Sequence, residues 1–399
     1  MAKIITIGVA LIAIIGIAAA AVWWFLFRQT PPVRPPVQPG IAGSAVDVSF
    51  PDITPLVSPD ESIALGPAGQ AKPVLVQLTD FPVIGPSLNK EETKILFYKK
   101  DGGDLMSSAL DAPVHEQIAN LTVIGLVDAF WSPKRDRAAL FYADGDSLKS
   151  FLHIGESTVV PLPLNLVSLS WSPSGSEFAY LRKDDDALHS SLATASAAGA
   201  NHRTVAALPL RDAHISWITS NTISLQSRPS GLAPGSLYHF SRSTGFLRRL
   251  IGPFNGLQAL WSDDGARALI TYTDAKGRNP RLAIADDDGD LSQESNAITT
   301  PGKCAWAGAK ELWCAVSDSL PEQSVFPDEY LQGGLSGGDR LVRFDFTKKE
   351  SSYTLSQSSF DMSHLIITKA KDYLFFINRK DGTLWSLRLQ QRTENREQR

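Results

Sequence analysis

Cysteine is scarce in this chain, with two among 399 residues. That count excludes a disulfide framework of the kind that holds small secreted domains together. No charge sign dominates either, because 38 lysines and arginines stand against 42 aspartates and glutamates. A net charge of −4 offers no basic surface for a polyanion, so we expect no nucleic-acid partner.

Recognisable catalytic and metal-binding motifs are also missing. The seven histidines form no H-x-x-x-H or H-E-x-x-H pair. Gly334–Gly338 matches G-x-S-x-G, but a nucleophile elbow needs a following helix and downstream Asp and His within an α/β sheet. The acidic stretch Asp286–Asp290 lacks the alternating ligands of an EF-hand and is typical of a hairpin turn. The sequence therefore predicts no catalytic residue, no metal and no cofactor.

One long apolar run is present at the N-terminus. Residues 4–27 contain no charged residue and no proline. As a helix at roughly 1.5 Å per residue, such a run is long enough to cross a hydrocarbon core of about 30 Å. Trp23 and Trp24 suit the membrane interface. A cleaved signal peptide is the alternative, but its apolar core is shorter, so we predict an uncleaved single-pass anchor.

The segments around the folded part can also be assigned. Residues 28–72 begin with five closely spaced prolines and are predicted to form a stalk and linker. Residues 390–399 are polar and are predicted to be a disordered tail. Lysine and arginine counts do not decide the orientation of the anchor. A short N-terminal tail before a large domain favours the extracytoplasmic side for that domain.

The stretch from 73 to 389 is repetitive. Five tryptophans recur at gaps of 40 to 46 residues, and each precedes a turn and an apolar strand. Residues 86–98 and 366–377 keep the turn and the strand without the tryptophan. Seven copies of about 45 residues are typical of a seven-bladed β-propeller with four strands per blade. The five tryptophans are Trp131, Trp171, Trp217, Trp261 and Trp306.

Burial explains why such a repeat closes into a ring. A four-stranded blade has two apolar faces, and only neighbouring blades can cover both. A large aromatic residue at one fixed position per blade fills the space between sheets, so we interpret the tryptophans as structural. The last copy offers only three strands, and residues 73–79 form an unassigned one. We predict that this first strand completes the last blade.

The motif Trp171-Ser-Pro-Ser-Gly175, with related versions at Trp261 and Trp131, resembles the repeat of the TolB-like propellers, a WD40-like family. The resemblance covers about four fifths of the chain and implies an all-β propeller. The motif indicates a propeller blade but does not indicate an activity. TolB carries an additional N-terminal α/β domain and six blades, so a role like that of TolB does not carry over.

Cys304 and Cys314 flank a turn centred near residue 309. If residues 303–307 and 311–316 are adjacent antiparallel strands, the two cysteines lie directly opposite each other, close to disulfide reach. We predict a disulfide, which would agree with an oxidising compartment.

One copy is longer than the others, with an insert at residues 317–339. Long loops in compact domains are often functional. Phe326 and Tyr330 could be contact residues on the rim of the propeller, or they could pin the loop to its own blade.

These observations favour a membrane-anchored, extracytoplasmic propeller that acts as a protein- or ligand-binding scaffold of the cell envelope, with an envelope protein of unidentified kind as its partner. The alternative is a hydrolase or lyase acting on glycans or peptides at the central channel mouth. Buried acids or histidines with shifted pKa values there would favour the enzyme.

Overall fold

The computed structural model describes residues 75–184, 189–348, 350–357 and 359–389. The chain divides into residues 1–46 and 47–399, and every described residue belongs to the second unit. Among them, no helix is long and apolar enough to span a membrane. The predicted anchor, the whole of the predicted stalk and linker, and the tail lie outside the described residues.

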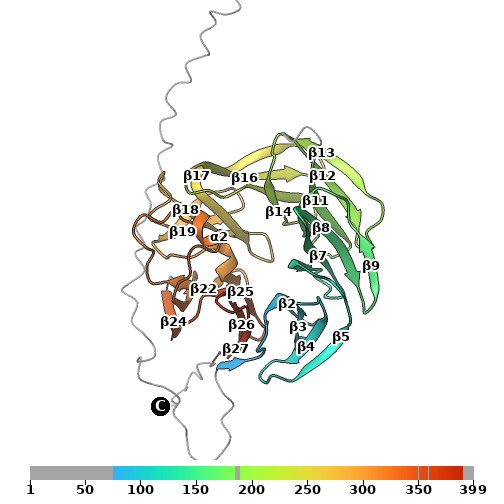
Figure 1. Ribbon diagram of the computed structural model, residues 1–399. Helices are drawn as coiled ribbons and strands as arrows, with labels where there is room; N and C mark the ends of the chain where they lie inside the picture. The colour runs from blue at the N-terminus through green and yellow to red at the C-terminus, as the bar shows by residue number, and fades with distance from the viewer. Residues whose placement is uncertain (1–74, 185–188, 349, 358, 390–399) are drawn as a thin grey trace, which may run out of the picture. The chain divides into compact units, whose positions relative to one another are not determined.

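The described residues form an all-β structure of antiparallel sheets, five with four strands and one with seven (Figure 1). We name the sheets A to F in chain order. Sheets A to C consist of β2 (Val83–Leu88), β3 (Lys94–Lys99), β4 (Leu105–Ala109) and β5 (His115–Ala119); β6 (Leu126–Trp131), β7 (Arg137–Asp144), β8 (Ser147–Ile154) and β9 (Thr158–Pro161); and β10 (Leu166–Trp171), β11 (Glu177–Lys183), β12 (Ser190–Ser196) and β13 (Arg203–Leu208).

Sheet D is the seven-stranded one, and sheets E and F follow it. Two short helices, η1 (Pro301–Lys303) and α2 (Asp328–Leu331), lie in connections. The strands of sheets D to F are β14 (Ala213–Trp217), β15 (Thr222–Ser227), β16 (Pro234–Ser241), β17 (Leu247–Trp261), β18 (Arg267–Thr273), β19 (Arg281–Asp286) and β20 (Leu291–Ser295); β21 (Cys304–Trp306), β22 (Glu311–Ser317), β23 (Asp339–Asp345) and β24 (Glu350–Gln357); and β25 (Met362–Ile367), β26 (Tyr373–Asn378), β27 (Leu384–Arg388) and β1 (Leu75–Gln77).

The hydrophobic cores lie between successive sheets. One core joins Phe141 and Leu152 of sheet B to Trp171 and Phe178 of sheet C, and the other cores repeat this arrangement. The second strands are therefore buried on both faces, which explains their continuous apolar runs, such as Ile-Leu-Phe-Tyr in β3. Four of the five repeat tryptophans pack between their own sheet and the preceding one, and Trp261 packs in a core between the two parts of sheet D.

The ring closes through the first strand. β1 pairs antiparallel with β27, so the N-terminal strand completes sheet F. Thr79 Oγ1 accepts a hydrogen bond from Leu384 N at 2.9 Å next to this pairing. A core containing Phe97 of sheet A and Phe375 of sheet F joins the first sheet to the last. The predicted pairing of the first strand with the last blade is present, and in Figure 1 the blue and red segments lie side by side.

Strand β17 makes sheet D continuous. Its first part pairs with β16 and its second part with β18, with a register shift between Asn255 and Gln258. Gly256 lies in this shift with φ +65°, and a Cβ there would come within 2.8 Å of Thr273 Oγ1. Glycine is therefore required where the strand passes from one partner to the next.

The turn after the first strand recurs along the chain. In five copies the fourth residue beyond the strand's last residue has positive φ. In each of them, its N–H donates to the carbonyl of the first turn residue. The two copies without tryptophan share this geometry, which explains why they match the repeat. The positive-φ residues are Glu92, Arg135, Gly175, Gly265 and Lys371.

Candidate functional site

The two ends of each sheet differ in their connections. Because neighbouring strands are antiparallel, the repeated turn after each first strand lies at one end, which we call the turn face. The connection between the second and third strands, and the connection into the next sheet, lie at the opposite end, which we call the loop face. The loop face includes residues 120–125, 162–165, 228–233, 274–280 and 318–338.

The insert between β22 and β23 crosses the loop face as a brace. Phe326 N donates to Gly277 O at 2.8 Å. The Asp328 carboxylate accepts hydrogen bonds from Ser230 Oγ at 2.9 Å and from Gly231 N at 2.5 Å. The insert of sheet E is thereby tied to two separate loops of sheet D.

Phe326 and Tyr330 hold this brace and are not exposed. They are 4% and 7% exposed, and their rings contact each other with centroids 6.1 Å apart. Tyr330 also lies under the guanidinium of Arg379, whose Cζ is 4.0 Å from the ring centroid. Of the two alternatives that the sequence left open, burial favours pinning of the insert over contact with a partner. They pin the insert, and they pin it to neighbouring sheets as well as to their own.

A buried charge cluster lies below Tyr330. Lys303 Nζ is 2.8 Å from Asp339 Oδ1 and 3.0 Å from Asp361 Oδ1. Arg379 Nη1 lies 3.2 Å from the second Asp361 oxygen. Asp339 Oδ2 accepts the backbone N–H of Met362 at 2.6 Å. Each charge has a partner, so the cluster joins η1, β23 and β25 and offers no free group for chemistry.

Asp128 and His364 interact electrostatically although they come from sheets B and F, which have sheet A between them. Desolvation raises the pKa of Asp128, opposed by the His364 charge and by the N–H of Ala129. Desolvation also lowers the pKa of His364, with Asp128 acting in the opposite direction and Arg379 in the same one. The two shifts move the pKa values of the carboxyl group and the imidazole toward each other, as is frequent for acid–base pairs at functional sites.

The backbone of His364 is unusual. Its φ is +52° within β25, at a register shift in the pairing with β26. Gly85 occupies the corresponding shift in β2 with φ +55°. Left-handed backbone disfavours a histidine by roughly 1–2 kcal/mol relative to glycine. Such strain is frequent at functional positions, which adds to the interest of this residue.

Large aliphatic side chains are exposed on the loop face. Ile124, between β5 and β6, is 84% exposed, and Leu164, between β9 and β10, is 69% exposed. Val127, at the start of β6, and Leu331, in the insert, are also exposed. Ile124 and Leu164 thus place an exposed aliphatic side chain in each of two successive connections between sheets.

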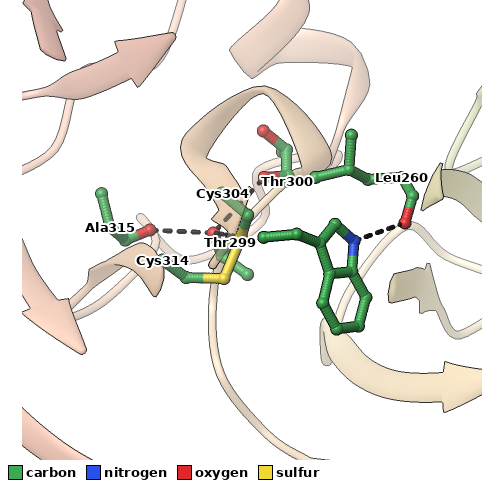
Figure 2. Close-up of a disulfide and its surroundings, with 7 residues drawn as sticks. Leu260, Thr299, Thr300, Cys304, Cys314 and Ala315 are labelled. Carbon is green, nitrogen blue, oxygen red and sulfur yellow. Dashed lines mark hydrogen bonds between the residues drawn. A yellow bond between two sulfur atoms is a disulfide. The ribbon is translucent and has the colours of Figure 1, made fainter. Parts of the chain in front are cut away.

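The two cysteines face each other across β21 and β22. Cys304 and Cys314 are register partners with Cα atoms 4.1 Å apart, and the structure joins them in a disulfide. Figure 2 shows this bond beside Thr299, whose Oγ1 donates to Ala315 O at 2.8 Å. The bond lies in the core between sheets D and E.

The remaining sequence candidates form turns and loops. Ser336 is followed by strand β23 and not by the helix of a nucleophile elbow. Asp286 Oδ1 accepts the N–H groups of residues 288–290, so the acidic stretch forms the predicted hairpin turn. Within the described residues, no group of three His, Cys, Asp or Glu side chains could hold a metal ion.

Sequence reasoning missed the charge cluster and the Asp128–His364 pair. Lys303 is separated from Asp339 and Asp361 by 36 and 58 residues. Each residue borders an apolar strand, as many other charged residues of this chain do. No local pattern distinguishes them, because the cluster forms only when sheet E packs against the start of sheet F, and the Asp128–His364 pair only when the ring closes.

No protein-family model matches this chain, and no curated protein matches it significantly by sequence. Among solved structures, an oligogalacturonate lyase in complex with manganese is similar with a TM-score of 0.58 at 13% identity, covering 79% of this chain and 93% of that one. An oligogalacturonate lyase from Vibrio parahaemolyticus has the same TM-score at 10% identity and covers 79% and 94%. TolB from Acinetobacter baumannii has a TM-score of 0.45 at 11% identity and covers 68% and 63%.

The two lyase structures carry the conclusion about fold. This chain has the TolB-like β-propeller fold, as the tryptophan repeat predicts.

Proposed function

We propose that this protein is a seven-bladed β-propeller, anchored by one transmembrane helix, that recruits an envelope protein through its loop face on the extracytoplasmic side. The observation that carries the proposal is the exposure of three aliphatic side chains on the loop face: Ile124 and Leu164 in successive connections between sheets, and Val127 at the start of β6. The most buried charges are paired with one another, which favours a structural role for them over catalysis.

The blade count is supported by sheet D. Strand β17 pairs on both sides, so it can serve as the last strand of one blade and the first strand of the next. The five four-stranded sheets and the two parts of sheet D then make seven blades. This count agrees with the seven sequence copies.

The location outside the cytoplasm is supported by two observations. Residues 4–27 are long and apolar enough for an anchor, and a proline-rich stretch separates them from the propeller. The disulfide between Cys304 and Cys314 suits an oxidising compartment.

In-cell cross-linking of the tagged full-length protein, followed by mass spectrometry, tests the partner. We expect one protein to recur with the wild type and to be lost with Ile124→Asp/Leu164→Asp. Phe246→Asp is the matched control, because Phe246 is 66% exposed in the hairpin between β16 and β17, on the turn face. A partner that recurs equally with both variants would refute a loop-face surface.

A second candidate function is a hydrolase or lyase acting on glycans or peptides, and it is favoured by the shifted pKa values of Asp128 and His364. The similar lyase binds manganese, but the described residues of this chain offer no group of metal ligands, so we derive no manganese-dependent step. The pair could supply a general acid and a general base.

Incubating the full-length protein with polygalacturonate and with a mixed peptide library tests this candidate. Product formation that is lost in both Asp128→Asn and His364→Gln would favour the enzyme over the scaffold. Absence of product, together with a recurring cross-linked partner, would favour the scaffold.

A further inference from the structure

A pocket of about 520 Å³ opens between β18, β19 and the segment that follows β20. Small-molecule sites typically have volumes of about 300–1,000 Å³. The charge cluster, the Asp128–His364 pair and the exposed aliphatic residues do not line this pocket. Its lining includes Tyr272, Asp274, Asn279, Pro280, Asn296 and Ile298, together with Arg281 and Thr273.

The loop that forms one wall is fixed by hydrogen bonds. Asp274 Oδ1 accepts the N–H groups of Lys276 at 2.8 Å and Arg278 at 2.9 Å, and Oδ2 accepts Asn279 Nδ2 at 2.8 Å. The brace holds the same loop from the other side through the bond from Phe326 N to Gly277 O. The wall is therefore shaped before any ligand arrives, which reduces the entropy cost of binding.

The aromatic lining is held as firmly. The Tyr272 ring stacks on Phe254 with centroids 4.9 Å apart and an interplanar angle of 26°. Its hydroxyl donates to Glu294 Oε1 at 2.5 Å. Arg281 Nη1 lies 3.5 Å from the other Glu294 oxygen. A single carboxylate thus fixes both the tyrosine and the arginine.

The charged side chains that line the pocket already have partners, whereas two of its carboxamide groups can still form hydrogen bonds with a ligand. Arg281 is countered by Glu294, and both Asp274 oxygens already accept hydrogen bonds. Asn279 Oδ1 and the exposed carboxamide of Asn296 have no partner among the described residues. A fitting ligand therefore needs hydroxyl groups for neutral amides and an apolar face for Tyr272, Pro280 and Ile298.

We infer that this pocket binds a neutral pyranose unit of a glycan. A sugar ring carries hydroxyl groups at its edge and C–H groups on its faces, and it brings no charge that the pocket would have to neutralise. The site is separate from the Asp128–His364 pair and from the exposed aliphatic surface. It therefore gives the propeller a second ligand class, whether or not a protein partner binds the loop face.

Saturation-transfer NMR on the full-length protein in phospholipid nanodiscs tests the inference. The probes are methyl β-glucoside, methyl β-galactoside, methyl α-mannoside and N-acetylglucosamine, with trigalacturonate as the charged comparison. We expect saturable binding of at least one neutral probe. Asn296→Ala should weaken it at least about fivefold, since a lost neutral hydrogen bond has an effect of that size.

Two further variants make the result specific. Asn279→Gly removes the second carboxamide and suits its left-handed backbone, at φ +54°, so the double variant with Asn296→Ala should abolish binding while leaving the melting temperature near that of the wild type. Asn120→Ala is the control, because Asn120 is also exposed on the loop face but lies outside the pocket. Binding of trigalacturonate alone, of no probe, or of a neutral probe equally to the double variant would overturn the inference.

Discussion

The turn face and the loop face of this propeller are built from the same strands and differ in their side chains. The turn face repeats one tight turn, with the same hydrogen bond and the same left-handed position in five copies. The loop face carries one long insert, a buried charge cluster, the Asp128–His364 pair and the exposed aliphatic residues. The comparison indicates that the repeat maintains the ring at one face and leaves the other face free to diverge.

The largest effect is expected from the charge cluster. Lys303→Ala leaves the buried Asp339 without its cation and leaves Asp361 with Arg379 alone, and breaking a buried ion pair costs about 3–5 kcal/mol of unfolding free energy. Urea unfolding of the full-length protein measures the loss. Lys369→Ala is the turn-face control, because that lysine is exposed and only 3.5 Å from Glu92, a pair whose removal changes stability by less than about 1 kcal/mol. Equal losses would contradict the distinction between the two faces.

A smaller loss is expected where the turn face packs most closely. A Cβ on Gly265 would lie 2.3 Å from Ile218 Cγ2, at φ +70°. Gly265→Ala therefore combines backbone strain with overpacking and should cost about 2–4 kcal/mol. Gly175 occupies the same turn position with φ +65°, and its nearest atom would be the flexible Lys134 side chain at 3.2 Å. Gly175→Ala should cost only about 1–2 kcal/mol in the same thermal and urea melts.

Glu311 provides a test that depends on pH. Burial acts to raise its pKa, but hydrogen bonds from Arg343, Lys371 and Trp313 prevail and lower it to about 2. Because its pKa is lower in the folded state than in the unfolded state, ionised Glu311 stabilises the fold at pH values above the unfolded-state pKa. This stabilisation is lost as pH falls toward 2. Glu311→Gln should therefore cost about 1–3 kcal/mol at neutral pH. The difference from the wild type should shrink below the ordinary glutamate range, and a difference independent of pH would exclude the carboxylate as its source.

The smallest effect is expected to have the opposite sign. His364→Gly relieves left-handed backbone strain and should stabilise the protein by about 1 kcal/mol. His214→Gly, in the middle of strand β14, should destabilise it by roughly 0.5–1 kcal/mol. If His364→Gly is also destabilising, the histidine side chain stabilises the fold, and the backbone strain is then no evidence for a function.

Much of the ring could be predicted from the sequence, because each copy contains its own turn, strand and core residue. The period of the tryptophans and the unpaired first strand were sufficient to predict the β1–β27 pairing. The site was less accessible. The sequence left open whether Phe326 and Tyr330 contact a partner or pin the insert, and only the structure shows that the insert folds back on Gly231, Gly277 and Arg379.

The sequence by itself determined the elements that depend on neighbours a few residues away: the strands, the repeated turns and the opposition of Cys304 and Cys314 across a hairpin. Only the tertiary structure decided which distant side chains meet. Lys303 meets Asp339 and Asp361 because sheet E packs against the start of sheet F. Asp128 interacts with His364 because closure of the ring brings sheets B and F together, although they are far apart in the chain. Local periodicity indicates which face of a strand is buried, but it does not indicate which distant residues come into contact.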